Sequence, residues 1–143
     1  MKKEICFDMD GTLADFYSVR NWLLHLQQGS TYPYEAARPM FVPWKLMRRL
    51  RELQRDGYKI KIISWGAKNC DDDFSERITA AKLAWLDVWF KFFEFDEIDI
   101  VPYGTPKSWF GEGILFDDEE ANREEWGENA YRPDQIMEVL NSL

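Results

Sequence analysis

Short apolar runs alternate with segments of helical periodicity along most of the chain. Residues 4–9, 58–64, 98–101 and 113–116 are apolar or alternating runs with the length and pattern of β-strands. Between and after these runs, apolar residues recur every three or four positions, as helices require: Val19, Trp22, Leu23 and Leu26; Leu46, Met47, Leu50 and Leu53; Phe74, Ile78, Ala81, Trp85 and Val88; Ile136, Val139, Leu140 and Leu143. This order predicts an α/β fold, a Rossmann-like three-layer α/β/α arrangement with a mostly parallel sheet.

Turn and capping residues mark several of the expected helix ends. Gly57 predicts the end of the second helical segment, and Pro133 predicts the start of the last one. Asp73, with Glu76 three positions later, resembles a capping box and predicts the start of the long third helix. Residues 29–43 hold glycine, serine and three prolines among aromatic residues, which predicts an irregular insertion packed by its own side chains.

Composition favours one folded domain spanning residues 1–143. Apolar residues make up 45% of the 143 positions, whereas Gly and Pro contribute only 8 and 6. The 26 acidic residues outnumber the 18 basic ones, so long nucleic acid is not an expected partner. Because the sequence has no apolar run long enough for a bilayer or a signal peptide, we expect a cytoplasmic protein without a membrane partner. His25 is the single histidine, which excludes a multi-histidine zinc site and leaves the chemistry to carboxylates.

The string DMDGTLAD, residues 8–15, carries the most informative chemistry. It places Asp8 and Asp10 two positions apart where the first predicted strand ends, and the flexible Gly11 follows. Two neighbouring carboxylates at neutral pH imply a bound cation, a shared proton or strong hydrogen bonds. A hard, oxygen-ligated ion such as Mg2+ fits best. The alternative is that both carboxylates merely close a turn with Gly11.

A second acidic pair, Asp117 and Asp118, ends the fourth predicted strand. If the first and fourth strands are neighbours, then Asp8, Asp10 and Asp117 can converge on one metal ion. The alternative is a solvated acidic loop leading into a helix N-terminus, where carboxylates are also favourable.

On these residues the sequence resembles the haloacid dehalogenase (HAD) superfamily of phosphohydrolases. Its four motifs match in order along nearly the whole chain: DMDGTLAD, then Ser64 after an apolar strand, then Lys107, then Asp117 with Asp118. Only the first motif is specific by itself, and the ordered set is much stronger. The resemblance implies a single HAD-like hydrolase domain with a small cap insertion at about residues 17–43.

The resemblance further implies a Mg2+-dependent phosphomonoester hydrolase that works through an aspartyl-phosphate intermediate. Asp8 would attack phosphorus, and Asp10 would act as general acid and base. Asp8, Asp117 and the backbone carbonyl of Asp10 would hold the Mg2+ ion. Asp118 would lie behind these ligands and would not contact the ion itself.

The second and third motifs would bind the phosphate. Ser64 would donate a hydrogen bond to a phosphate oxygen, and Lys107 would compensate the charge of the transition state. Lys82 competes with Lys107, because it lies on the long helix that follows Ser64, but the spacing of Lys107 before the fourth strand favours Lys107. The alternatives are a turn serine and a solvated surface lysine.

A closer resemblance is to the 5'(3')-deoxyribonucleotidase-like branch, carried by DMDGTLADF, AKLAWLDVWF and TPKSWFGEGILFDD. It implies that Phe16 helps to form a nucleotide pocket and that Lys82 lies near the phosphate. The expected partner is therefore a small phosphorylated substrate, and a (deoxy)nucleoside monophosphate is the first candidate. Trp65, next to Ser64, is a further substrate-binding candidate. For Phe16 and Trp65 the alternative is ordinary packing.

The segment between the first two motifs is shorter than the cap of those nucleotidases, which predicts a more open site. The sequence leaves open whether residues 29–43 close over the site or a second copy of the chain, in a homodimer, supplies a lid. Two other functions remain: a phosphatase for another small metabolite or a nucleic-acid end, and a non-catalytic phosphate-binding module on this fold. The complete set of motif residues favours an enzyme.

Overall fold

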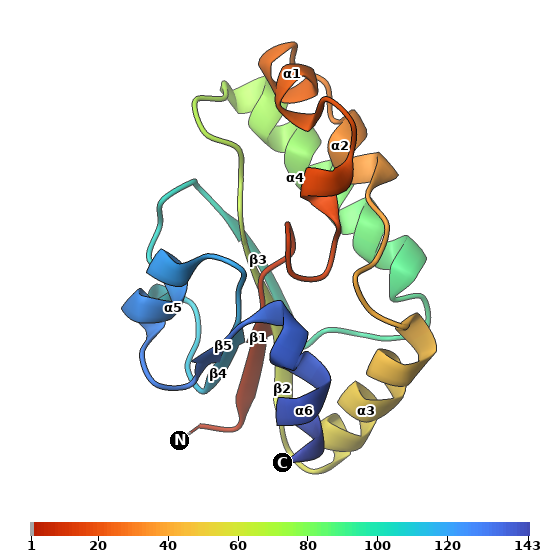
Figure 1. Ribbon diagram of the computed structural model, residues 1–143, viewed down its shortest axis with the longest axis vertical. Coiled ribbons are helices and arrows are strands. Elements are labelled where there is room, and N and C mark those ends of the chain that lie inside the picture. The colour runs from red at the N-terminus through yellow and green to blue at the C-terminus, as the bar shows by residue number, and fades with distance from the viewer. Residues whose placement is uncertain (1) are drawn as a thin grey trace.

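The computed structural model describes residues 2–143 and is built around a parallel sheet (Figure 1). Its five strands are β1 (Glu4–Phe7), β2 (Lys59–Trp65), β3 (Glu97–Val101), β4 (Ile114–Phe116) and β5 (Ala130–Tyr131). They lie in the order β3-β2-β1-β4-β5, and every neighbouring pair is parallel. The predicted α/β class and parallel sheet are therefore confirmed, and the strand β5 was not predicted.

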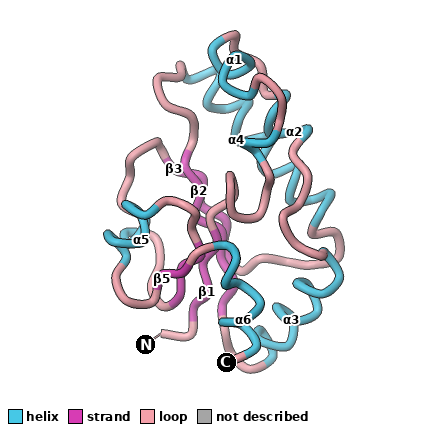
Figure 2. The backbone as a smooth tube through the Cα atoms, viewed as in Figure 1, coloured by secondary structure: helices cyan, strands magenta, loops and turns pink. Residues whose placement is uncertain are grey.

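Helices connect the strands and flank the sheet (Figure 2). Between β1 and β2 lie the 3-10 helix η1 (Phe16–Ser18) and the helices α1 (Trp22–Gln27), α2 (Tyr32–Ala36) and α3 (Pro43–Arg55). The remaining helical elements are α4 (Asp72–Trp89), η2 (Lys107–Trp109), α5 (Glu120–Trp126), η3 (Pro133–Gln135) and α6 (Ile136–Asn141). None of the helices within residues 2–143 is both long and apolar enough to span a membrane.

The sheet separates two apolar layers because successive side chains on each strand point to opposite faces. On one face, buried residues of β1, β2 and β4 pack against α3, α4 and α6: Ile5, Phe7, Ile60, Ile62, Ile114, Phe116, Leu46, Leu50, Leu53, Trp85, Leu86, Ile136 and Leu140. On the other face, a smaller layer contains Cys6, Ile63 and Leu115, with Phe110 and Trp126 packed against them. Helices thus lie on both faces of the sheet, and the carboxyl ends of the central strands open along one edge.

The segment before α3 packs on the first half of α4, away from the sheet (Figure 1). Its aromatic residues Phe16 and Tyr34 form a separate cluster with Phe74, Ile78 and Ala81 of α4. The expectation of an irregular 29–43 insertion is wrong for residues 32–36, which form α2. Pro33 does not oppose that helix, because it lies in the first turn, where its missing N–H is not needed.

Several expected helix details also differ. Helix α4 is capped by Asp71, whose carboxylate accepts a hydrogen bond from the Phe74 N–H at 2.8 Å, so the cap expected at Asp73 is wrong. Val88 is 64% exposed, because the face of α4 that meets the sheet is centred on Trp85 and Leu86. Leu23 and Leu143 are also exposed, contrary to their expected inward positions.

Candidate active site

The carboxyl ends of β1 and β4 place two aspartates side by side. Phe7 is in register with Phe116, and the Asp8 N–H donates to the Phe116 carbonyl at 2.9 Å. The next residues, Asp8 and Asp117, therefore leave the sheet together, and both are buried. Ser64, near the end of β2 on the other side of β1, is buried as well. The adjacency of strands that the metal hypothesis required is thus present.

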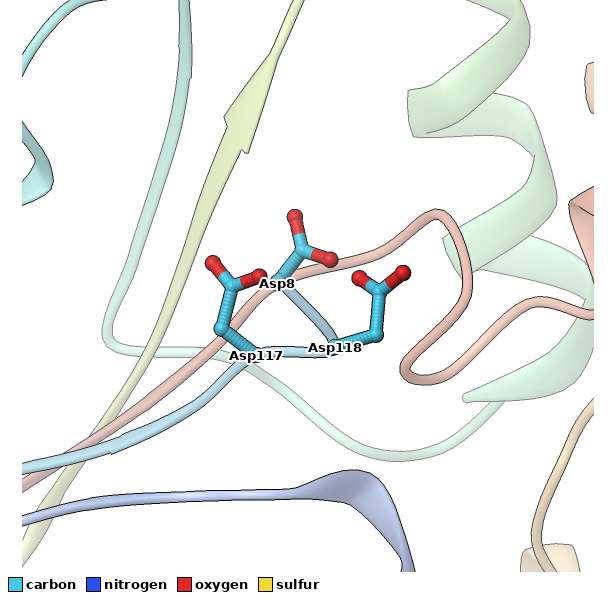
Figure 3. Close-up of side chains that lie close together, drawn as sticks. All are labelled: Asp8, Asp117 and Asp118. Atoms are coloured by element: carbon cyan, nitrogen blue, oxygen red, sulfur yellow. The ribbon is translucent and has the colours of Figure 1, made fainter. Parts of the chain in front are cut away.

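Three carboxylates gather at this edge. Asp8, Asp117 and Asp118 each offer one oxygen, and these oxygens lie within 4.8 Å of one another. Figure 3 shows the three side chains projecting to the same side of the backbone segments that carry them. Asp118 was expected to lie behind the metal ligands, but its carboxylate belongs to the same cluster as those of Asp8 and Asp117. Asp10 contributes no carboxylate to it, because its side chain pairs with Lys82.

Lys107 is buried and connects the ends of β1 and β4. Its Nζ donates to Asp8 Oδ1 and to Asp117 Oδ2, both at 2.7 Å, and the side chain is 1% exposed. Burial opposes the charge of Lys107, but the charges of Asp8 and Asp117 outweigh burial and raise the pKa of its ammonium group. Of the two competing lysines, Lys107 is the one that contacts the expected nucleophile.

Lys82, on α4, contacts a different pair of site residues. Its Nζ donates to Asp10 Oδ2 at 2.9 Å, to Ser64 Oγ at 2.7 Å and to the Trp65 carbonyl at 2.6 Å. Burial raises the pKa of the Asp10 carboxyl, whereas the charge of Lys82 opposes that rise. Lys82 therefore joins the first and second motifs within the site.

Thr12 is a site residue that the sequence reasoning missed, although it lies inside the DMDGTLAD string. Its hydroxyl donates to Asp8 Oδ2 at 2.9 Å and accepts a hydrogen bond from the Asp118 N–H at 3.1 Å. Gly11, beside it, has a φ of 82°, and a Cβ at that position would collide with the Asp118 carboxylate. The local turn thus fixes the orientation of both carboxylates.

Helix α5 supplies a second group that was missed. Asn122 donates to Asp117 Oδ2 at 3.1 Å, and the Arg123 guanidinium donates to the Asp117 carbonyl at 3.0 Å. The Glu119 N–H donates to the other carboxylate oxygen of Asp117 at 2.9 Å. No pattern in the sequence indicates Asn122, because α5 has no apolar periodicity that would show which face it buries.

The site carries more negative than positive charge. Four carboxylates face two ammonium groups, those of Lys82 and Lys107. Burial, reinforced by the charge of Asp8, raises the pKa of Asp117 to about 6 and that of Asp118 to about 8. A divalent cation among these oxygens would relieve the repulsion, so the donor set suits a hard ion such as Mg2+.

A cleft of about 480 Å³ leads from the carboxylates towards the helices before α3. Asp8, Asp10, Asp117 and Asp118 lie at one end, and the aromatic residues that line the cleft are Phe16, Tyr17, Trp22, Tyr34, Trp65, Phe74 and Tyr103. The rings of Trp65 and Tyr103 are 4.9 Å apart, and Trp65 Nε1 donates to the Thr105 carbonyl at 2.8 Å. Among residues 2–143, Lys68 is the one lysine or arginine that lines this cleft.

Comparisons with known proteins do not assign a family to the chain. No protein-family model matches it, and no curated protein matches its sequence significantly.

Proposed function

We propose that this chain is a HAD-type, Mg2+-dependent phosphomonoester hydrolase that acts through an aspartyl-phosphate on Asp8. The observation that carries the proposal is the bridge that Lys107 makes between Asp8 and Asp117 at the ends of neighbouring parallel strands. It joins three of the four expected motifs, and Lys82 connects Ser64 to Asp10 beside them. Phosphoryl transfer requires a nucleophile, a metal ion and positive charge in one place.

The donor set fits the metal ion that this chemistry requires. Asp8, Asp117 and the backbone carbonyl of Asp10 would hold Mg2+, as the resemblance implies, and the position of the Asp118 carboxylate supports adding it to this set. The ion, when bound, would offset the repulsion between the Asp8 carboxylate and an anionic phosphate.

Asp8 is oriented for attack by hydrogen bonds to both of its oxygens, one from Lys107 and one from Thr12. In the first step an Asp8 oxygen forms a bond to phosphorus, the bond from phosphorus to the leaving oxygen breaks, and Asp10 gives that oxygen a proton. In the second step Asp10 takes a proton from water. The water oxygen bonds to phosphorus, the acyl phosphate breaks, and Asp8 and inorganic phosphate are released.

Lys107 and Ser64 would stabilise the phosphate oxygens during both steps. Lys107 makes two hydrogen bonds to residues within 2–143, which leaves one N–H for a substrate oxygen. Ser64 accepts a hydrogen bond from Lys82, so its own hydroxyl proton can be donated. Both groups are buried and fixed, which is the arrangement that favours electrostatic stabilisation of a transition state.

The aromatic lining of the cleft supports a phosphate ester whose alcohol part carries an aromatic ring, and a (deoxy)nucleoside monophosphate is the first candidate. Phe16 and Trp65, the aromatic residues predicted to bind substrate, both line the cleft, and stacking on a base suits such rings. Residues 17–43 contribute Trp22 and Tyr34 to the lining and would serve as the small cap. With Lys68 as its one lining cation, the cleft has little charge to hold additional phosphates.

Phosphate release from a substrate panel tests the proposal. The panel contains nucleoside 5'- and 3'-monophosphates, sugar phosphates and a phosphorylated oligonucleotide, each with Mg2+ and with EDTA. We expect Mg2+-dependent release, with mononucleotides preferred, and no release by Asp8→Asn that is shown by circular dichroism to be folded. Asp87→Asn, which alters an exposed aspartate on α4, is the matched control and should retain full activity. Release that persists in Asp8→Asn would contradict the covalent mechanism, and activity highest on the oligonucleotide would instead favour a nucleic-acid end as substrate.

A further inference from the structure

Every N–H of the Lys82 ammonium group has a protein acceptor. The three acceptors are Asp10 Oδ2, Ser64 Oγ and the Trp65 carbonyl, at 2.9, 2.7 and 2.6 Å. The side chain is 1% exposed, and the ring centroid of Tyr34 lies 5.2 Å from Nζ. A lysine has three donors, so a phosphate oxygen could bind Lys82 only by displacing one of these acceptors.

The two buried lysines therefore differ in what they can offer a substrate. Lys107 contacts two carboxylates and retains one N–H, whereas Lys82 is saturated. Neither lysine lines the cleft itself, although Asp10 and Trp65, which Lys82 contacts, and Asp8 and Asp117, which Lys107 contacts, all do, so the number of free N–H groups is what distinguishes the two lysines. Its position on α4 fixes it between the first and second motifs.

We propose that Lys82 is a positioning residue, which holds the Asp10 carboxylate and the Ser64 hydroxyl in place for catalysis and does not bind the substrate's phosphate. This inference rests on the proposed function. It departs from the expectation that Lys82 lies against the phosphate, and it assigns the phosphate contact to Lys107 and Ser64. Loss of Lys82 should therefore reproduce loss of proton transfer by Asp10, and it should weaken phosphate binding much less than loss of Lys107, because Lys82 acts on the phosphate only through Ser64.

The test compares Lys82→Met with Asp10→Asn on two substrates that differ in leaving group. An alkyl phosphate needs a proton on its leaving oxygen, whereas p-nitrophenyl phosphate does not. For both variants we expect kcat to fall about 100-fold or more on the alkyl phosphate and less than about 10-fold on p-nitrophenyl phosphate, with KM nearly unchanged. The double variant should be no slower than the slower single variant, because both changes remove the same function.

Binding of inorganic phosphate in the presence of Mg2+, measured by calorimetry, gives a readout that needs no turnover. We expect Lys82→Met to bind phosphate within about 3-fold of the wild type, and Lys107→Met to bind it at least about 10-fold more weakly. Phosphate binding by Lys82→Met as weak as that of Lys107→Met, or an equal loss of kcat on both substrates, would overturn the inference. A wild-type protein that binds phosphate but hydrolyses no substrate would contradict the proposed function alone.

Removing a buried ammonium beside Asp10 can also prevent folding. If Lys82→Met does not fold, the variant that combines it with Asp10→Asn removes both charges and is compared with Asp10→Asn alone. The inference requires equal phosphate binding and equal kcat in these two proteins. A further loss of phosphate binding in the combined variant would show that Lys82 contacts the phosphate itself.

Discussion

Raising the pH should destabilise the Mg2+-free protein, because folding brings the carboxylates of the site together. Asp117 is fully buried near Asp8 and Asp118, and burial followed by the charge of Asp8 raises its pKa from 3.8 to about 6. The pKa of Asp118 is raised by the same two causes. Between the unfolded and folded pKa values the folded chain binds more protons than the unfolded chain. Stability is therefore greatest below the unfolded pKa and is lost as the pH rises through the folded value.

The magnitude follows from the displacement of the Asp117 pKa. A difference of about two pH units corresponds to about 3 kcal/mol, since each unit is worth about 1.4 kcal/mol. For a domain of this size, about 3 kcal/mol lowers the unfolding midpoint by roughly 10 °C. Because Mg2+ binds deprotonated carboxylates, its stabilising effect should grow over the same pH range.

Thermal unfolding followed at about pH 4, 5, 6, 7 and 8, with EDTA and with Mg2+, measures both effects. Asp117→Asn should show a flatter pH dependence in EDTA, because a neutral amide replaces the titrating group. The exposed Asp87→Asn should behave as the wild type. A wild-type midpoint that rises or stays constant from about pH 5 to about pH 8 in EDTA would refute the reasoning.

Three further changes test separate parts of the structure. Gly11→Ala should lower the unfolding free energy by about 1–3 kcal/mol and weaken Mg2+ binding, because the new Cβ would displace the Asp118 carboxylate. Its control is Gly104→Ala, which also lies at positive φ but has no neighbouring atoms, so it should be strained without changing Mg2+ binding. Lys107→Met should lose about 3–5 kcal/mol in denaturant unfolding, part of which Mg2+ restores, because the two aspartates that it bridges are left unpaired. Trp85→Phe removes the hydrogen bond from Nε1 to the Ala37 carbonyl, so it should lower the unfolding free energy by about 1–2 kcal/mol and leave kcat unchanged.

Most of the fold could be predicted from the sequence because its central strands are continuous apolar runs and its longer helices are amphipathic. The observed bounds of strands β1 and β2 and of helices α3 and α4 agree within a few residues with those that the apolar pattern predicts. The exceptions have physical reasons. Helix α5 is mostly polar, and strand β5 has only two residues, so neither has a recognisable apolar pattern. Helix α2 begins with a Tyr-Pro pair, which is typical of a turn.

The convergence of Asp8 and Asp117 could be predicted because parallel strands carry their carboxyl ends to the same edge of a sheet. The contacts of Lys82 could not, because they depend on how α4 crosses the sheet and on which of its turns faces Ser64. Asn122 was beyond prediction for the same reason: its contact with Asp117 arises from the packing of a helix that has no apolar stripe.

The charges of the site also explain why its two lysines are arranged as they are. Each ammonium group pairs with carboxylates of a different motif, and together they leave an excess of two negative charges when all four carboxylates are ionised. In the proposed function, a bound divalent cation would cancel that excess, and the site would then no longer repel a phosphate dianion. A third buried lysine in place of the cation would cancel only one of the two negative charges. If the proposed function holds, the excess of carboxylates therefore couples metal binding to phosphate binding at this edge of the sheet.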